Sequence, residues 1–292
     1  MKTDPDVRPR SRSRKVVTFL AKLTLGVCLM FIGLLTACQS SLIYFPRPYE
    51  AGEVTTWSKG GGATLIDYRT EDGPQQAYLL STTAKPEHLW FVCGGNGTVA
   101  LEWSDWIRKH GPPGDAWLLV DMPGYGACGG SPSPRSIRRT VKAVVPAAAE
   151  ALHWSPGEAQ SRLRFFGHSL GCAICLEAAR EYDIREGVLL SPFTSTMDMA
   201  RAVTGLPLGW LVWHRFDNLA RLREIEAKGR GRIFILHGQA DEVIPVRMSR
   251  ELAAAAPHTV QLIEVPGGHH NTLQEIAIPQ IEKALKDARD AP

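Results

Sequence analysis

The sequence predicts an α/β fold in which a mostly parallel central sheet carries helices on both faces. Three observations support this prediction: short, almost purely apolar runs, longer segments with helical spacing of apolar residues, and a regular alternation of the two. Near-continuous apolar runs are typical of parallel strands that are covered on both sides of the sheet. Their alternation with helical segments indicates right-handed strand–helix–strand crossovers.

The expected elements follow in chain order. Residues 63–68 and 76–81 flank the turn residues Glu71, Asp72 and Gly73, which predicts an antiparallel hairpin. Buried strands are expected at 88–93, 116–121, 162–167, 187–190, 232–236 and 260–265. Helices are expected at 99–109, 136–153, 170–181, 246–255 and 273–287. The 39 residues of the segment 192–230 separate two strands and predict a small lid that contains Phe193, Trp210, Trp213 and Phe216.

Length and charge exclude several broad classes of protein. With 292 residues, 44% of them hydrophobic and 22% charged, the chain is neither collagen-like, nor disordered, nor a disulfide-dense miniprotein. The net charge of +3 is uneven, because residues 1–37 carry seven basic and two acidic side chains and the rest sums to −2. A nearly neutral body argues against a nucleic acid partner, since phosphate binding requires a basic face. No internal repeat or linker interrupts residues 42–289, so we expect one domain over 38–292.

The N-terminal 37 residues have the pattern of a targeting segment. Residues 23–37 contain no charge and lead into the tetrad Leu35-Thr36-Ala37-Cys38. These fifteen residues are short for a bilayer span and typical of the apolar region of a secretory signal. The preceding basic region consists of Arg8, Arg10, Arg12, Arg14 and Lys15.

This segment resembles the signal peptide of bacterial lipoproteins. The resemblance implies cleavage before Cys38, lipidation of that cysteine, and a mature chain of 255 residues on the periplasmic side of the cell envelope. Gln39, in place of an aspartate after the cysteine, implies the outer membrane. Several acyl chains make such an anchor stable, whereas one chain binds a membrane only marginally. The alternative is an uncleaved signal anchor that starts near Val16, and both interpretations place the body outside the cytoplasm.

Six cysteines occur, at positions 28, 38, 93, 128, 172 and 175. Cys172 and Cys175 form a CxxC pair, which is compatible with a redox motif. The pair follows a strand-to-helix turn and does not open a thioredoxin-like unit, so small buried thiols that pack a helix on the sheet are the favoured interpretation. The sequence leaves the disulfide state of Cys93, Cys128, Cys172 and Cys175 open.

Residues 167–171 read Gly-His-Ser-Leu-Gly and lie between a predicted strand and a predicted helix. This is the context of a G-x-S-x-G nucleophile elbow, in which the serine occupies a strained turn and its hydroxyl stands above the sheet. Gly167 and Gly171 allow this turn, because a Cβ at either position would collide with the neighbouring strand and helix. A helix N-terminus also favours an oxyanion at this point. We therefore predict that Ser169 is a nucleophile rather than an ordinary helix cap.

A serine nucleophile needs a histidine base and a carboxylate, which follow an elbow of this type in the chain order Ser, Asp, His. Downstream, the strand expected at 232–236 leads into His237 and Asp241. The next strand leads into His269 and His270. Both residue types therefore follow strand ends in the required order.

On these motifs the chain resembles the α/β-hydrolase superfamily, in particular its BEM46-like and ABHD-type serine hydrolases. The matching motifs cover nearly the whole body and lie at 42–46, 121–126, 167–171, 191–193, 216–218, 237–241 and 268–271. The resemblance implies an α/β-hydrolase fold with a small lid, Asp241 as the triad acid and His270 as the base, with His269 as the alternative base. It also implies an oxyanion hole built from the backbone N–H groups of Asn96 and Leu170. Gly94 replaces a histidine that family members carry in the same loop.

These assignments predict a serine hydrolase that cleaves an ester or thioester bond through an acyl-enzyme. The expected substrate is a small or lipid-like acyl compound, as for a carboxylesterase, a lipase or an acyl thioesterase. No cofactor is required. His269 and His270 do not fit a metal site, because adjacent side chains diverge and no H-E-x-x-H motif accompanies them.

Three other interpretations stay open. Gly95, Gly97 and Ala100 follow a strand and Asp121 ends the next strand, which is the spacing of a dinucleotide-binding fingerprint, although this interpretation leaves Ser169 and its motif unexplained. The same fold is compatible with a membrane-tethered binding module that has no catalytic activity. Among enzymes, peptidases of the prolyl-oligopeptidase type share the order of the triad, but they usually carry an additional gating domain.

Overall fold

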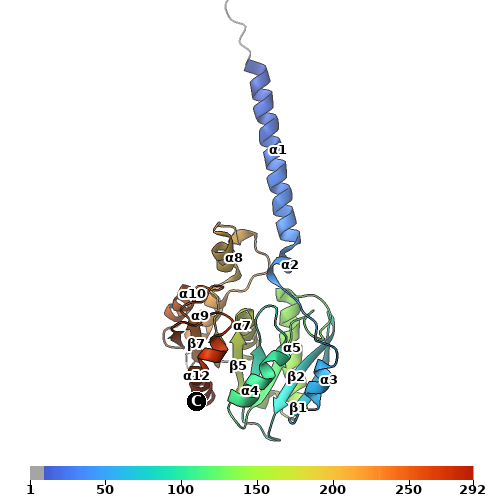
Figure 1. Ribbon diagram of the computed structural model, residues 1–292, viewed down its shortest axis with the longest axis vertical. Coiled ribbons are helices and arrows are strands. Elements are labelled where there is room, and N and C mark those ends of the chain that lie inside the picture. Colours follow the sequence, from blue (N-terminus) through green and yellow to red (C-terminus); the bar gives the residue numbers. More distant parts are fainter. Residues whose placement is uncertain (1–9, 230, 292) are drawn as a thin grey trace, which may run out of the picture.

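The computed structural model describes residues 10–229 and 231–291. The start of the predicted signal segment, including Arg8, and Arg230 at the end of the predicted lid lie outside the described residues. The body is built around an eight-stranded sheet, and a long helix projects from one end of it (Figure 1). The strands are β1 (Ala63–Thr70), β2 (Gly73–Ser81), β3 (Leu89–Cys93), β4 (Ala116–Val120), β5 (Leu163–His168), β6 (Glu186–Leu190), β7 (Arg232–Gly238) and β8 (Val260–Val265).

The strands lie in the order β1-β2-β4-β3-β5-β6-β7-β8. β2 pairs antiparallel with β1 and β4, and the other neighbours pair in parallel, which confirms the hairpin and the mostly parallel sheet. From β3 the chain continues to β4 on one side, whereas β5 lies on the other side of β3. In open α/β sheets, ligands bind at the carboxyl ends of the strands beside such a reversal of strand order. The fold therefore predicts a site after β3 and β5.

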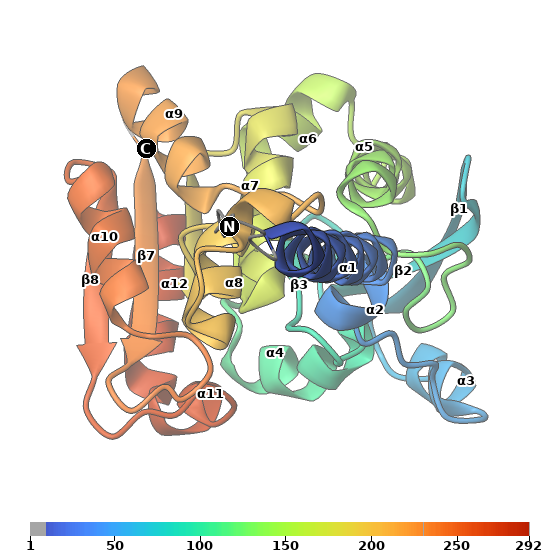
Figure 2. The ribbon, with the colours of Figure 1, turned by 90° about the horizontal axis from the view of Figure 1, so that it is seen from above.

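Helices cover both faces of the sheet, as predicted. The helices on one face are α5 (Pro134–Ala151), α7 (Leu170–Tyr182), α9 (Asn218–Lys228) and α10 (Arg247–Ala255). Those on the other face are the 3₁₀ helix η1 (Ala100–Trp103), α4 (Ser104–His110) and α12 (Ile278–Arg289). Neighbouring residues of one strand point to opposite faces, so Phe165 joins the first buried cluster and Phe166 the second. Figure 2 shows α5 and α7 on one side of the sheet and α4 on the other.

Several helices differ from the prediction, and two of these differences have a local cause in the sequence. The helix expected at 273–287 is broken at Ala277 into α11 (Leu273–Ile276) and α12. Pro279 lies in the first turn of α12, because inside a continuous helix its ring would clash with the preceding turn and remove a hydrogen bond. The short helix α6 (Pro156–Arg162) was not predicted, although Ser155 and Glu158 form a capping box at its start.

The connection between β6 and β7 has two parts. Its second part is α9, which belongs to the helical layer because Leu222 and Ile225 pack in the core. The part that leaves this layer is the segment 196–216, which holds α8 (Thr196–Thr204) and the 3₁₀ helix η2 (Gly209–Leu211). A bridge between Ser195 and Asp217 closes its base. We refer to residues 196–216 as the projecting segment, and its role as a lid stays a prediction.

The projecting long helix is α1 (Arg10–Ala37), which is followed by α2 (Gln39–Ile43) and α3 (Glu53–Ser58). Its 21-residue stretch Arg14–Leu34 is apolar and not buried against the body. By length and composition this stretch can cross a membrane, and a signal sequence meets the same criteria. The helix is therefore compatible with both the predicted signal peptide and the signal anchor, and the location of the protein stays a prediction.

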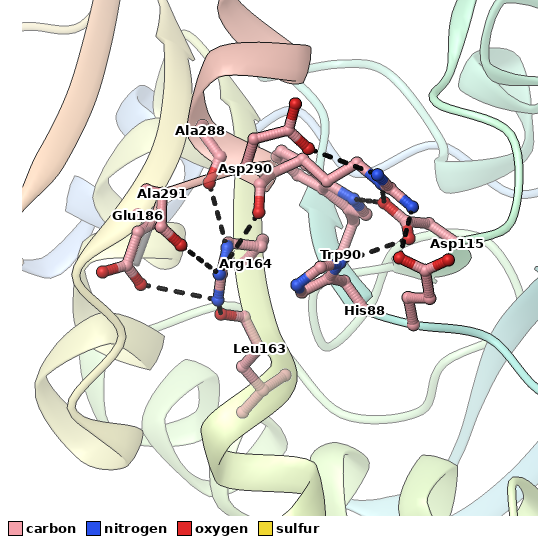
Figure 3. A network of polar contacts seen from close by, with 11 residues as sticks. His88, Trp90, Asp115, Leu163, Arg164, Glu186, Ala288, Asp290 and Ala291 are labelled. Carbon is pink, nitrogen blue, oxygen red and sulfur yellow. Dashed lines mark hydrogen bonds and ion pairs between the residues drawn. The ribbon is translucent and has the colours of Figure 1, made fainter.

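A buried polar network fastens the C-terminal helix to the amino ends of the strands (Figure 3). Arg164 of β5 donates to the Ala288 carbonyl at 3.1 Å and lies 3.5 Å from the Glu186 carboxylate. Asp115, which precedes β4, accepts a hydrogen bond of 3.1 Å from Arg289 Nε. The candidate site lies at the carboxyl ends of the parallel strands. This network lies at the opposite edge of the sheet.

Candidate active site

Ser169 occupies the sharp turn between β5 and α7. Its backbone has φ 54° and ψ −120°, a conformation that non-glycine residues rarely adopt and that the surroundings must hold. A Cβ on Gly171 would lie 2.0 Å from the Cys93 carbonyl oxygen, and one on Gly167 would lie 2.9 Å from Cys172 Cα. The close approach of α7 to β3 and β5 therefore requires both glycines, and the turn has the strained form that the motif predicts.

His270 lies between Ser169 and Asp241. Its Nε2 is 3.0 Å from Ser169 Oγ, and its Nδ1 is 2.8 Å from Asp241 Oδ2. The three residues follow β5, β7 and β8, so the carboxyl edge of the sheet brings together groups that are distant in sequence. When Nδ1–H donates to the carboxylate, Nε2 is free to accept the serine proton. Ser169 and His270 are only 8% and 4% exposed, which leaves little water to compete for these contacts.

The Asp241 carboxylate has further partners besides His270. Its Oδ1 accepts the N–H groups of Val243 at 2.9 Å and Ile244 at 2.7 Å, and its Oδ2 lies 3.2 Å from His237 Nε2. Burial alone raises the pKa of Asp241, but the hydrogen bonds from His237, His270 and Ile244 outweigh it and hold the pKa well below its ordinary value. Asp241 is therefore ionised at neutral pH and oriented toward His270.

His237 contacts Asp241, the predicted acid, and the sequence did not predict this contact. The side chain is fully buried, and its Nε2 faces two acceptors, the Asp241 carboxylate and the Ile244 carbonyl at 2.8 Å. Nε2 therefore donates, while Nδ1 lies 2.6 Å from the Ser249 hydroxyl. The signal was present in the spacing His-Gly-x-x-Asp, which places the two side chains in one tight turn after β7.

His269 points away from the nucleophile. Its side chain is 58% exposed and lies 3.1 Å from the Glu242 carboxylate. Within the described ranges, His270 contacts Ser169 and Asp241, and His269 contacts neither. The geometry therefore does not support His269 as the alternative base.

His168 joins the nucleophile turn to the loop that carries the base. Its Nε2 lies 3.2 Å from the main-chain oxygen of His270, and the two rings are 5.0 Å apart. Burial, together with the neighbouring His270, lowers the pKa of His168 to about 4, so the ring is uncharged at neutral pH. Because a carbonyl oxygen only accepts, Nε2 is the donor of this bond.

The loop after β3 lies against the nucleophile turn. A Cβ on Gly95 would be 2.9 Å from His168 Nδ1 and 3.4 Å from Ser169 Cβ, so a larger residue would push the loop away. The backbone N–H groups of Asn96 and Leu170 have no acceptor among the residues that the structure describes. These two groups are the predicted oxyanion donors, and both remain available to a ligand oxygen.

The side chain of Asn96 fastens this loop to the segment after α2. Its Nδ2 donates to the Ile43 carbonyl at 2.6 Å. Its Oδ1 accepts from the Phe45 N–H at 3.0 Å and from the Tyr125 hydroxyl at 2.7 Å. The loop is therefore held in place although Gly94 replaces the histidine of the family pattern.

Comparisons with known proteins agree with this architecture, although no protein-family model matches the sequence. The uncharacterised protein Rv2307c of Mycobacterium tuberculosis is 29% identical over 269 residues, which cover 90% of this chain and 89% of that protein. The mouse alpha/beta hydrolase domain-containing protein 17C is 26% identical over 154 residues, 53% of this chain and 45% of that protein. The structure of the Pyrococcus furiosus esterase Pf2001 is similar with a TM-score of 0.62 and 17% identity, over 84% of this chain and 97% of the esterase. The chain therefore has the fold of the α/β-hydrolase superfamily.

In this fold, Asp121 is not available to a nucleotide. It is 2% exposed, and its two oxygens accept from the Tyr49 hydroxyl at 2.6 Å and from the Ala100 N–H at 2.8 Å. Burial raises the pKa of Asp121 to about 7 in spite of these two hydrogen bonds. A dinucleotide-binding fold needs this carboxylate free for a ribose hydroxyl, so the fingerprint interpretation does not hold.

The cysteines of the body are free thiols in the part of the chain that the structure describes. Cys172 and Cys175 are buried on α7, where burial raises the pKa of both thiols well above the usual range. Cys172 Sγ donates to the Leu190 carbonyl at 3.2 Å, so this thiol packs the helix on the sheet. The described residues contain no cluster of three His, Cys, Asp or Glu side chains arranged to hold a metal ion.

Proposed function

We propose that this α/β-hydrolase is a serine hydrolase that cleaves carboxylic ester or thioester bonds. The observation that carries the proposal is the relay from Ser169 to His270 at 3.0 Å and from His270 to Asp241 at 2.8 Å. General-base activation of a serine hydroxyl requires this arrangement. The α/β-hydrolase fold, which the P. furiosus esterase shares, supports a hydrolase.

In the acylation step, Ser169 Oγ attacks the carbonyl carbon of the substrate while its proton passes to His270 Nε2. Asp241, held ionised by its hydrogen bonds, stabilises the imidazolium that forms. The oxyanion of the tetrahedral intermediate accepts hydrogen bonds from the N–H groups of Asn96 and Leu170. His270 then gives its proton to the leaving alcohol or thiol as the C–O or C–S bond breaks, and an acyl-serine remains.

In the second step, water attacks the acyl-serine. His270 takes a proton from this water, the second tetrahedral intermediate uses the same two N–H donors, and collapse returns the proton to Ser169 Oγ. The products are a carboxylic acid and the free enzyme. No step of this cycle requires a cofactor.

Replacement of the nucleophile tests the proposal. We expect Ser169→Ala to lower kcat for a short p-nitrophenyl ester by roughly 10⁴-fold or more and to abolish labelling by a fluorophosphonate probe. Ser161→Ala is the matched control, because Ser161 is exposed on α6 and should keep wild-type turnover and labelling. Wild-type hydrolysis by Ser169→Ala would contradict the proposed role.

A substrate panel separates the alternatives. The full-length protein is assayed with p-nitrophenyl esters of graded chain length, an acyl thioester and a peptide amide. Turnover of esters or thioesters supports the proposal, and turnover of the amide alone favours a peptidase. No turnover together with no fluorophosphonate labelling favours a non-catalytic binding module.

We also propose that Cys38 carries a lipid anchor after removal of a signal peptide. In support, Cys38 is an exposed thiol at the end of the apolar helix α1. Mass spectrometry of the protein from a bacterial envelope fraction tests this, because an acylated N-terminal Cys38 and its loss in Cys38→Ala are expected. An intact N-terminus that still contains α1 would favour the signal anchor.

A further inference from the structure

The projecting segment exposes large apolar side chains. Val203, Leu206, Trp210 and Trp213 are 76%, 54%, 62% and 76% exposed. Single exposed apolar residues are ordinary, but four of them on one short segment that stands off the body mark an interaction surface. We refer to these four residues as the apolar tip.

The apolar tip lies next to the body end of the proposed N-terminal anchor. Gln39 is buried against the projecting segment: its Nε2 donates to the Leu211 carbonyl, and its Oε1 accepts the Trp213 N–H at 2.7 Å. Figure 1 shows α8 and α2 at the same end of the body, the end from which α1 projects. Gln39 directly follows Cys38, so an anchor formed by α1 and one formed by a lipid on Cys38 both enter the bilayer beside this segment.

A second contact also joins the residues after Cys38 to the projecting segment. Tyr44 is buried, and its hydroxyl lies 3.3 Å from His214 Nδ1, one residue after the Trp213 main chain that binds Gln39. Between these two contacts, Leu42 is 57% exposed, and Phe45 just beyond them is 58% exposed. The apolar surface therefore continues from the projecting segment onto the residues that follow the anchor.

The polar groups of the segment also fit a bilayer surface. Its basic side chains are Arg201 and Arg215, which can reach anionic headgroups. Its one carboxylate, Asp198, accepts from the hydroxyls of Thr194 and Ser195 at 2.7 Å each and lies at the base of the segment. Tryptophan side chains such as Trp210 are enriched at the headgroup level of membranes. This combination matches lipid better than it matches the core of a protein interface.

We propose that the apolar tip inserts into the headgroup–acyl boundary of the bilayer to which the chain is anchored. The N-terminal anchor holds the body at the surface, and the tip adds a second contact that fixes its orientation. Because one anchor point allows the body to rotate, the second contact sets which side of the hydrolase faces the lipid. The inference concerns this orientation; it rests on the proposed N-terminal anchor and does not depend on the proposed hydrolysis.

Fluorescence quenching tests the insertion. Full-length protein is reconstituted into phosphatidylcholine vesicles with brominated acyl chains, which quench tryptophan at the acyl boundary. We expect quenching relative to unbrominated vesicles, and loss of most of that quenching in the double variant Trp210→Phe/Trp213→Phe. Trp154→Phe is the matched control, since Trp154 packs on Arg162 near the amino end of β5 and should leave the quenching unchanged.

A second pair of variants tests the contact between the apolar tip and the bilayer while Trp210 and Trp213 are both kept. Val203→Asp/Leu206→Asp should reduce the quenching of Trp210 and Trp213, because carboxylates resist transfer into the boundary. Ile276→Asp, an exposed apolar position on α11, should not reduce it. Unchanged melting temperatures establish that the variants fold. Absence of quenching in the wild type overturns the proposal, and so does quenching in Trp210→Phe/Trp213→Phe that equals that of the wild type. A dimer in detergent that buries the same two tryptophans also overturns it.

Discussion

His168 donates a hydrogen bond of 3.2 Å from Nε2 to the main-chain carbonyl of His270. The residue before Ser169 thus holds the loop of His270, and the link between the two loops is a ring that is buried and uncharged at neutral pH. We regard His168 as a positioning residue, because it acts through the backbone of His270.

Removal of this bond should affect turnover more than binding. We expect His168→Ala to lower kcat for a p-nitrophenyl ester by roughly 10- to 100-fold with a smaller change in KM, since a shift of about 1 Å in the base disturbs proton transfer. His168→Gln, whose amide can donate to the same carbonyl, should recover part of the loss. Equal kcat in His168→Ala and the wild type would exclude this positioning role.

The same residue makes stability depend on pH. Folding lowers the pKa of His168 from 6.5 to about 4, so the unfolded chain binds this proton first as the pH falls. The stabilising contribution is complete above pH 6.5 and is lost progressively down to about pH 4, and at pH 5 it has fallen by about 2 kcal/mol. Urea unfolding at pH 7 and pH 5 should show a smaller loss in His168→Gln than in the wild type. Asp121, with its pKa raised to about 7, acts in the opposite sense in both proteins and cancels in the comparison.

The two adjacent histidines should behave differently. His270→Ala is expected to lower kcat by roughly 10⁴-fold or more, because Ser169 loses its base. His269→Ala removes only an exposed pair with Glu242 and should leave kcat within about twofold. Steady-state kinetics on a short ester checks both, and a comparable loss in the two variants would contradict the geometry.

Asp241→Asn should lower kcat strongly without removing the base. An amide in place of the carboxylate no longer stabilises the imidazolium or selects the Nδ1–H tautomer, so we expect a loss of up to about 10⁴-fold. Glu242→Gln, one residue further on, is the control and should keep wild-type kcat. A loss of less than tenfold in Asp241→Asn would remove Asp241 from the proposed triad.

Asn96→Ala tests how the oxyanion loop is held. The backbone N–H of residue 96 remains, but the Ile43 carbonyl loses its side-chain donor, and the Phe45 N–H keeps only the Tyr125 hydroxyl as an acceptor. We therefore expect about 1–3 kcal/mol less stability and roughly tenfold lower kcat. Tyr125→Phe removes the hydroxyl that donates to Asn96 Oδ1 and accepts from the Phe45 N–H, but it leaves the contacts of Asn96 with Ile43 and Phe45, so it should show a smaller effect in both measurements. Thermal unfolding and ester turnover are measured on the same preparations. Unchanged stability and kcat in Asn96→Ala would show that its side chain does not hold the loop against Ser169.

Arg164→Ala should affect stability alone. It leaves the Glu186 carboxylate buried without its cation, and breaking a buried pair of this kind lowers the free energy of unfolding by about 3–5 kcal/mol. Lys142→Ala, from an exposed pair with Glu181 at 3.6 Å, should change it by less than about 1 kcal/mol. At a temperature where both variants are folded, kcat should be unchanged, because the network lies at the opposite edge of the sheet from Ser169.

The strands were predictable because each is a short apolar run that is buried on both faces. Local signals were weaker where the chain departs from regular elements. The break at Ala277 follows from Pro279, and α6 follows from the capping box of Ser155 and Glu158, so both had a signal in the sequence. The projecting segment 196–216 is shorter than the lid predicted at 192–230, because the apolar face of α9 is buried on the sheet. Only the tertiary structure shows this burial.

By itself the sequence determined the α/β class, the elbow around Ser169 and the order of the candidate acid and base, because these depend on local periodicity and on glycines at fixed spacing. The tertiary structure decided which of two adjacent histidines faces Ser169, that His237 supports Asp241, and that Asn96 holds its loop through Ile43 and Phe45. Local patterns cannot carry this information, since neighbouring side chains diverge and the loops that follow β3, β5, β7 and β8 meet only when the sheet is assembled. The physical reason is that the direction of a side chain in a loop is set by its distant packing partners.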